Sequence, residues 1–310
     1  MTVRIGTNPI GWSNDDLPEL GGETLLETCL AEARSAGFTG IELGNKFPRS
    51  PAALRPILER HGLDLVSGWY GSALRRRSVE EEKRAVEPHL ALLEAMGCAV
   101  MVFAETSDTV QGNRDVPVSR RPVMADDEWR RFGEDLTAVA EHLQSRGIRM
   151  AYHHHMGTVV ETGAEVDRLM AVTGDAVGLL FDTGHLTYAG AAPADVAERH
   201  AARIVHVHCK DVRSDVLRAA KARDGSFLDS VVDGVFTVPG DGSVDFPACL
   251  APLARAGYRG WLVVEAEQDP AKAHPLTYAK LGYDNLTRMA RTAGLMPEPA
   301  RGDAAGQPSA

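Results

Sequence analysis

Cysteine is scarce in this sequence, and long apolar runs are missing from it. The four cysteines are scattered and form no Cys-x-x-Cys pair, which argues against a disulfide framework and a structural zinc site. No apolar stretch approaches the length of a membrane span. The first residues enter a strand-like run without the apolar core of a signal peptide. We therefore expect a reduced, cytoplasmic protein with no membrane partner.

The sequence also has fewer basic than acidic residues. Lysine and arginine total 33 against 43 aspartates and glutamates, which gives a formal net charge of −10 with histidine taken as neutral. Such a surface repels phosphate backbones and anionic lipid, so nucleic acid is not an expected partner. With 44% apolar and 25% charged residues, the 310-residue chain has the composition of a globular protein that can bury a large core.

Short apolar, β-branched runs alternate with longer helical patterns, and this alternation predicts parallel strands covered by helices. The expected strands are 3–8, 40–43, 63–67, 99–104, 148–153, 177–182, 203–208 and 261–265. The expected helices are 23–36, 51–61, 79–96, 126–146, 164–172, 194–200, 246–256 and 275–293. Glycine repeatedly separates a helix from the next strand, as helix C-caps do.

Eight strand–helix units predict a closed (β/α)8 TIM barrel, an α/β fold, in one domain over residues 1–296. The main alternative is an open, doubly wound sheet, but no Gly-x-Gly-x-x-Gly follows the first strand. Two long segments, 105–125 and 211–244, should lie at the C-terminal mouth of the barrel, where such enzymes keep their active sites. The tail 297–310 is rich in proline, glycine, alanine and polar residues, and we expect it to be disordered.

Polar side chains end four of the predicted strands, although buried barrel strands should be apolar. Asp182, His208 and Glu265 end three of them. Because all strand C-termini of a barrel converge on one mouth, we expect these three side chains to meet there. Two carboxylates and an imidazole suit a divalent ion such as Mn²⁺, Co²⁺ or Zn²⁺.

The fourth metal ligand should come from strand 148–153, which ends in consecutive histidines. Alternation puts His153 and His155 on one face and His154 on the other. His153 stands at the strand end and is the first choice, with His155 and Glu161 as reserves.

Each of these residues has an ordinary structural explanation when taken alone. Asp182 precedes Thr-Gly and could be a helix N-cap. His206 and His208 could be hydrogen-bonded core histidines. It is the convergence of four such strand ends that favours a metal centre.

Four residues are candidates for general acid or base chemistry, and their order is left open. Lys210 follows His208 by two and should share its inward face, where burial could tune its pKa toward neutrality. Lys210 and the second candidate lysine, Lys46, could instead be solvated surface charges. The candidates are Glu42, Lys46, His185 and Lys210. The candidate substrate contacts are Trp12, His155 and His206.

Several strings resemble the xylose-isomerase-like barrel superfamily of isomerases, epimerases and dehydratases. They are the strand-end Asp-Thr-Gly-His at 182–185, His-Val-His-Cys-Lys-Asp at 206–211, Pro-Gly-Asp-Gly at 239–242 and Val-Val-Glu at 263–265. Two more specific strings are similar to those of inosose dehydratases: Gly-Thr-Asn-Pro-Ile-Gly-Trp-Ser-Asn-Asp-Asp at 6–16 and Tyr-His-His-His-Met-Gly-Thr at 152–158. The resemblance extends over roughly residues 3–293.

The resemblance implies a metal-dependent dehydratase of myo-inositol catabolism, which converts 2-keto-myo-inositol to a trihydroxycyclohexane-dione with Mn²⁺ or Co²⁺. It also implies a small polyol or keto-sugar as substrate, glutathione as a further cofactor, and a homo-oligomer. One departure concerns His153, which stands where many superfamily members have a metal-binding glutamate.

Three alternatives stay open at this point. The first is an isomerase or epimerase of a free keto-sugar at the same metal site. The second is an endonuclease-like barrel, which the charge of −10 disfavours. The third is a binding protein whose site has decayed.

Overall fold

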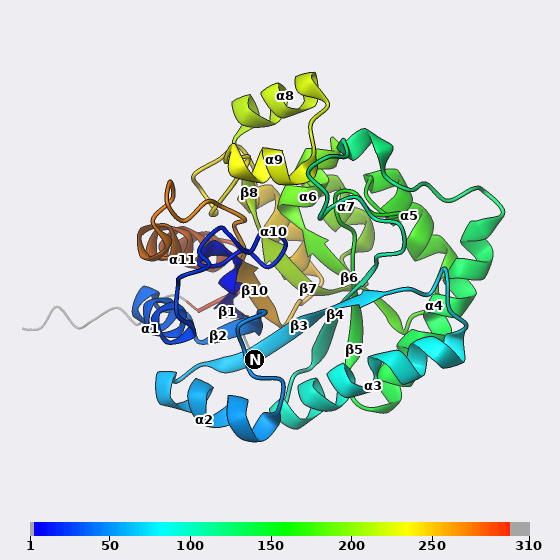
Figure 1. The fold of residues 1–310 in the computed structure, drawn as a ribbon, viewed down its shortest axis with the longest axis horizontal. Coiled ribbons are helices and arrows are strands. Elements are labelled where there is room, and N and C mark those ends of the chain that lie inside the picture. The colour runs from blue at the N-terminus through cyan, green and yellow to red at the C-terminus, as the bar shows by residue number, and fades with distance from the viewer. Residues whose placement is uncertain (1–2, 298–310) are drawn as a thin grey trace, which may run out of the picture.

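The computed structural model describes residues 3–297, so the tail predicted to be disordered lies almost wholly outside the described residues. Its centre is a closed barrel of parallel strands in the order β1-β10-β7-β6-β5-β4-β3-β2 (Figure 1). The barrel strands are β1 (Arg4–Thr7), β2 (Gly40–Leu43), β3 (Asp64–Ser72), β4 (Val100–Glu105), β5 (Arg149–His153), β6 (Val177–Asp182), β7 (Ile204–Cys209) and β10 (Trp261–Val264). The predicted (β/α)8 fold is confirmed, and the open sheet is excluded.

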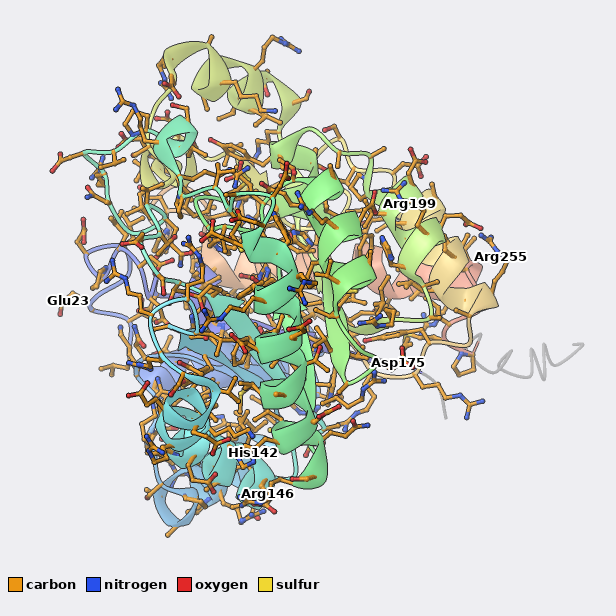
Figure 2. All side chains as sticks on the ribbon, turned by 90° about the vertical axis from the view of Figure 1, so that its right-hand side faces the viewer. Glu23, His142, Arg146, Asp175, Arg199 and Arg255 are labelled. Carbon is orange, nitrogen blue, oxygen red and sulfur yellow. The ribbon has the colours of Figure 1, made fainter. Side chains whose placement is uncertain are left out.

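Helices cover the outside of the barrel and follow the strands in the expected alternation. They are α1 (Leu26–Ala36), α2 (Pro51–His61), α3 (Val79–Met96), α4 (Glu128–Ser145), α5 (Gly163–Val172), α7 (Pro193–His200), α10 (Phe246–Arg255) and α11 (Pro275–Thr292). Gly37, Gly62 and Gly97 end the first three in the left-handed conformation that glycine adopts without strain. Figure 2 shows charged side chains projecting from this helical shell, with Arg199 on α7 and Arg255 on α10 among them.

Two strands differ in length from their predictions by two residues or more. The first stops at Thr7 because the Asn8 side chain accepts the Ile10 N–H and begins the 3-10 turn η1 (Pro9–Gly11). The third runs on to Ser72 because its last four residues stay paired with β4 as far as Glu105. Both deviations depend on tertiary pairing or local capping, which apolar periodicity does not reveal.

Extra elements occupy the C-terminal mouth. The short helix α6 (Thr183–Ala189) follows β6 directly, and the segment after β7 contains β8 (Asp211–Val212), α8 (Ser214–Arg223), α9 (Phe227–Val232) and β9 (Phe236–Thr237). The second long segment, after β4, contains η2 (Val118–Arg120) and touches this insertion through an Arg114–Asp229 ion pair of 2.7 Å. Both long segments therefore lie at the mouth, as expected.

Alternation along the strands gives the barrel wall two different faces. Val102, Ala151 and Leu180 form a small apolar cluster of their own. The residues between them, such as Met150 and Phe181, belong to the large cluster shared with the helices. The small cluster therefore fills the barrel interior, and the next inward position on β5 is His153.

The four cysteines are buried free thiols, in agreement with the expected absence of a disulfide framework. Within residues 3–297, no helix is both long and apolar enough to cross a bilayer.

We predict that Gly178→Ala on β6 destabilises the barrel. A Cβ at this position would lie 2.4 Å from Val205 Cγ2 and 2.7 Å from the backbone oxygen of Met150. Such overpacking should cost about 1–3 kcal/mol of unfolding free energy in urea titrations. Gly112→Ala is the matched control, because no atom lies within 4 Å of its added Cβ. A Gly178→Ala protein as stable as the parent would contradict the packing argument.

Candidate active site

The structure brings together the four residues predicted as metal ligands. His153, Asp182, His208 and Glu265 are buried, and one ligand atom from each lies within 4.8 Å of the others. They stand at the C-terminal ends of β5, β6 and β7 and directly after β10. This cluster, called the four-residue centre below, therefore has the spatial arrangement that the strand ends predicted.

Three polar atoms in this centre have no hydrogen-bond partner outside it among the described residues: Asp182 Oδ2, His208 Nδ1 and Glu265 Oε2. Within the centre, His208 Nδ1 pairs with Glu265 Oε2 and lies 3.5 Å from Asp182 Oδ2. The other oxygen of Asp182 accepts the N–H of His185 at 2.8 Å and caps α6. Asp182 is thus an N-cap through one oxygen and a potential ligand through the other. Buried polar atoms are rarely left without a partner, and here they point at one another.

Each of the two histidines uses one ring nitrogen for a hydrogen bond outside the centre and directs the other nitrogen into it. His153 Nδ1 donates to the His154 carbonyl oxygen at 2.6 Å, so its Nε2 presents a lone pair 3.8 Å from Asp182 Oδ2. Burial and the neighbouring His208 hold the pKa of His153 well below its ordinary value, which keeps the ring neutral. His208 donates from Nε2 to Glu42 at 3.2 Å and directs Nδ1 toward Glu265 in the centre. Burial would lower the pKa of His208, but Glu265 and Glu42 raise it well above its ordinary value. Two nitrogens and two carboxylate oxygens fit a divalent cation.

Glu42 on β2 orients other groups and has no free oxygen of its own. Its carboxylate accepts hydrogen bonds from His206 (2.8 Å), His208 (3.2 Å), Ser67 (2.6 Å) and Asn8 (2.7 Å). Burial would raise its pKa, but His208 and His206 outweigh that effect and hold it well below the ordinary value. The structure therefore does not support Glu42 as an acid or base. Nor does His206 contact the cavity as predicted, because its Nε2 is bonded to Glu42.

Lys210 lies fully buried beside the centre. Its Nζ donates to Glu267 Oε1 at 2.5 Å and to His185 Nε2 at 3.0 Å. Burial alone would lower the pKa of the lysine, but Glu265, Glu267 and Asp182 raise it above its ordinary value. Lys210 therefore stays an ammonium, and the expectation that it is tuned toward neutrality is wrong.

The aliphatic stem of Lys210 explains why the Asp-Thr-Gly-His string has glycine at position 184. A Cβ on Gly184 would lie 2.5 Å from Lys210 Cγ. The close approach of Lys210 to α6 therefore requires a residue without a side chain at position 184.

Glu267 is the residue that our sequence analysis missed. It is 1% exposed, and its Oε2 has no partner within residues 3–297. Burial raises its pKa above the ordinary value despite the nearby Lys210. The signal was present in the sequence, since Glu267 follows Glu265 by two residues and alternation puts both on one face.

A cavity of about 190 Å³ opens above the centre. His153, His208 and Glu265 of the centre line it, and so does the predicted substrate contact His155. His155 donates from Nδ1 to the Met156 carbonyl oxygen at 2.9 Å, and its ring lies 3.9 Å from that of His185. The other lining residues are Asn8, Ile10, Asp15, Asp16, Glu42, Leu43, Asn45, Arg49, Trp69, Val102, Gln111 and Glu267.

Two further predicted site residues, Lys46 and Trp12, lie outside this cavity. The Lys46 ammonium donates to the carbonyl oxygens of Gly21, Gly22 and Thr24 at 2.6–3.0 Å, so it clamps a loop. The Trp12 indole is buried and donates to Glu32 at 2.7 Å. Both follow strand ends, but their side chains bond to groups outside the cavity, which strand counting cannot foresee.

Glu161, the reserve ligand, also lies outside the four-residue centre. Its carboxylate accepts the N–H of Gly157 at 2.7 Å and pairs with Arg121 at 3.3 Å. Burial raises the pKa of Glu161 to about 7.

A closed parallel barrel whose strand ends gather carboxylates and imidazoles around a cavity defines a (β/α)8 enzyme class. The model of the xylose isomerase-like TIM barrel matches residues 30–289, and the chain belongs to that family.

Relatives extend this result over nearly the whole chain. The chain is 56% identical over 294 residues to the rhizopine catabolism protein MocC of Rhizobium meliloti, covering 95% of this chain and 90% of that protein. It is 44% identical over 280 residues to inosose dehydratase 2 of Bacillus cereus, covering 90% and 94%. Among solved structures, an L-ribulose 3-epimerase superposes with a TM-score of 0.67 at 18% identity, covering 94% of this chain and 96% of that one. This last likeness shows the fold alone.

We predict that Glu42→Gln weakens Mn²⁺ binding by about ten- to hundredfold, because an amide in this place no longer accepts from His208 as a carboxylate does. Titration calorimetry of metal-stripped protein measures the change. Ser67→Ala is the control, since it removes another donor to Glu42 and leaves both histidine bonds in place. Equal affinities in the parent and Glu42→Gln would contradict an orienting role.

We also predict that Glu161 makes stability depend on pH. Its pKa is raised from 4.5 to about 7 in the folded protein. Its stabilising contribution is therefore full below about pH 4.5 and is lost as the pH rises through about 7. Glu161→Gln should flatten the fall in melting temperature between pH 5 and pH 8. An unchanged slope in that variant would show that other groups cause the dependence.

Proposed function

We propose that this chain is an inosose dehydratase, a lyase that removes water from 2-keto-myo-inositol and yields a trihydroxycyclohexane-1,2-dione. The relative named inosose dehydratase 2 supports the substrate, at 44% identity over 90% of this chain. The observation that carries the chemistry is the four-residue centre, in which buried imidazole and carboxylate atoms face one another beneath a cavity.

A divalent cation held by His153, Asp182, His208 and Glu265 would act as a Lewis acid on the substrate ketone and make the neighbouring C–H more acidic. In our proposal, Glu267 removes this α-proton through its unpartnered Oε2. Breaking the C–O bond at the β-carbon releases the hydroxyl group, and Glu267 returns the proton to it, so that water leaves. The enol that remains becomes the dione by tautomerisation.

In this proposal, the predicted catalytic residues Lys210 and His185 act through Glu267 and do not contact the substrate. Neither lines the cavity, and both are fully buried. The Lys210 ammonium fixes Glu267 at 2.5 Å and stabilises the carboxylate as it gains and loses its proton. His185 accepts a second hydrogen bond from Lys210 and limits its rotation.

An isomerase or epimerase of a free keto-sugar remains the second candidate, because it would share the cation and the enolisation step. The two candidates differ in their product, since only the dehydratase forms an unsaturated, strongly absorbing dione. An endonuclease-like activity is disfavoured by the net charge of −10.

Several properties remain predictions. They are Mn²⁺ or Co²⁺ as the native metal, Zn²⁺ as an alternative metal, glutathione as a cofactor, a homo-oligomer and a cytoplasmic location. The donor set of two imidazoles and two carboxylates is compatible with all three metals.

The decisive test is turnover by metal-stripped and Mn²⁺-reloaded protein. We expect reloaded protein to convert inosose to the dione, followed by ultraviolet absorbance, and stripped protein to lose activity. Asp182→Asn and Glu265→Gln should each lower kcat/KM more than about a hundredfold while the melting temperature of the stripped protein is kept. Asp175→Asn is the matched control, because Asp175 is fully exposed.

Two outcomes would contradict the proposal. Normal turnover in either variant would remove that residue from the ligand set. Conversion of ketoses by the reloaded protein without dione formation from inosose would favour the isomerase.

A further inference from the structure

The end of the string at residues 6–16 has no role in the reaction described above, although it lies in the segment between β1 and α1. Asn14 is 2% exposed, and its side-chain oxygen accepts the N–H groups of Asp16 (2.9 Å) and Leu17 (2.8 Å). Leu17 anchors the loop in the apolar cluster of the α8–α9 insertion, beside Phe227. The backbone at Asp16 is therefore fixed from within the loop and from the insertion.

A second set of bonds fixes the same loop from β2. The Asp15 carboxylate accepts the N–H of Asn45 with both oxygens at 3.1 Å. Lys46 holds three carbonyl oxygens further along the loop. The lysine predicted as catalytic thus serves to hold this loop in place.

Asp16 is the residue that this scaffold presents to the cavity. It is partly buried and lines the cavity, and no described residue donates a hydrogen bond to its carboxylate. Glu267 lines the same cavity, and burial together with the negative charge of Glu267 raises the pKa of Asp16. His155 and Lys210 act on the pKa of Asp16 in the opposite direction, and Lys210 is already bonded to Glu267.

A carboxylate without a hydrogen-bond donor, in a cavity lined by a second carboxylate, selects its ligand by charge. It accepts hydrogen bonds from hydroxyl groups, and it repels phosphates and carboxylates. The one arginine or lysine in the described lining is Arg49, which donates to the Gly44 carbonyl oxygen at 3.1 Å.

We propose that Asp16 is a specificity-determining residue, which binds ring hydroxyls of an uncharged polyol and excludes anionic rings. This inference rests on the proposed function, because it assigns the substrate class of the same cavity. It also gives the loop at residues 6–16 its purpose.

The first test measures turnover of inosose by Mn²⁺-loaded Asp16→Asn and Asp16→Ala. Loss of the charged acceptor should raise KM about ten- to hundredfold and leave kcat within about threefold, because the contact is made in the ground state and the transition state alike. Glu19→Gln is the matched control, since it removes the same charge from an exposed position of the same loop. An unchanged KM in both Asp16 variants overturns the proposal.

The second test does not need turnover. Calorimetry on Mn²⁺-loaded protein compares myo-inositol with myo-inositol 1-phosphate. The parent and Glu19→Gln should prefer the uncharged ring, and Asp16→Asn should reduce this preference about tenfold or more. Melting temperatures equal to the parent's show that Asp16→Asn and Glu19→Gln are folded. An equal preference in the parent and Asp16→Asn then overturns the proposal.

The two tests separate this inference from the proposed function. If the parent fails to convert inosose, the dehydratase proposal fails, and the binding ratio alone decides the role of Asp16. If the parent converts inosose but Asp16→Asn has the parent's ratio of affinities for the two inositols, the dehydratase proposal stands. Asp16 is then not the residue that determines its specificity.

Discussion

The mouth of the barrel buries far more negative than positive charge, and the rest of the site depends on that imbalance. Glu42, Asp182, Glu265 and Glu267 are all at most 6% exposed, and Lys210 is the one buried ammonium among residues 3–297. Buried carboxylates are stable only when cations or hydrogen-bond donors surround them. The histidines, the lysine and the capping N–H of α6 supply part of this compensation. A divalent cation would supply the remainder.

The hydrogen bonds around this charge divide the carboxylates into separate roles. Glu42 accepts four donors and is fully occupied, so it orients His208. Asp182 divides its two oxygens between a helix N-terminus and the four-residue centre. Glu267 is held by Lys210 at one oxygen and free at the other. Residues of one chemical type therefore serve differently because their neighbours differ, a distinction that residue identity alone does not contain.

The fold and the four-residue centre could be predicted because they follow from periodicity and topology. Strand ends of a barrel converge whatever the loops do, so Asp182, His208 and Glu265 were placed correctly from their strands alone. Lys46 and Trp12 could not be placed, since their positions depend on how the loops after β1 and β2 fold. Glu267 was missed although the same alternation rule reaches it, because the strand was taken to end at Glu265. The charge state of Lys210 required the three-dimensional arrangement of its acidic neighbours.

The contact between Gly184 and the stem of Lys210 links two positions that lie on different strand–loop junctions. A methyl group at 184 would push the ammonium away from Glu267, and shortening residue 210 would leave a void over α6. Neither position is therefore free to vary without the other. In descendants of this sequence, a larger residue at 184 and a shorter one at 210 would have to arise together.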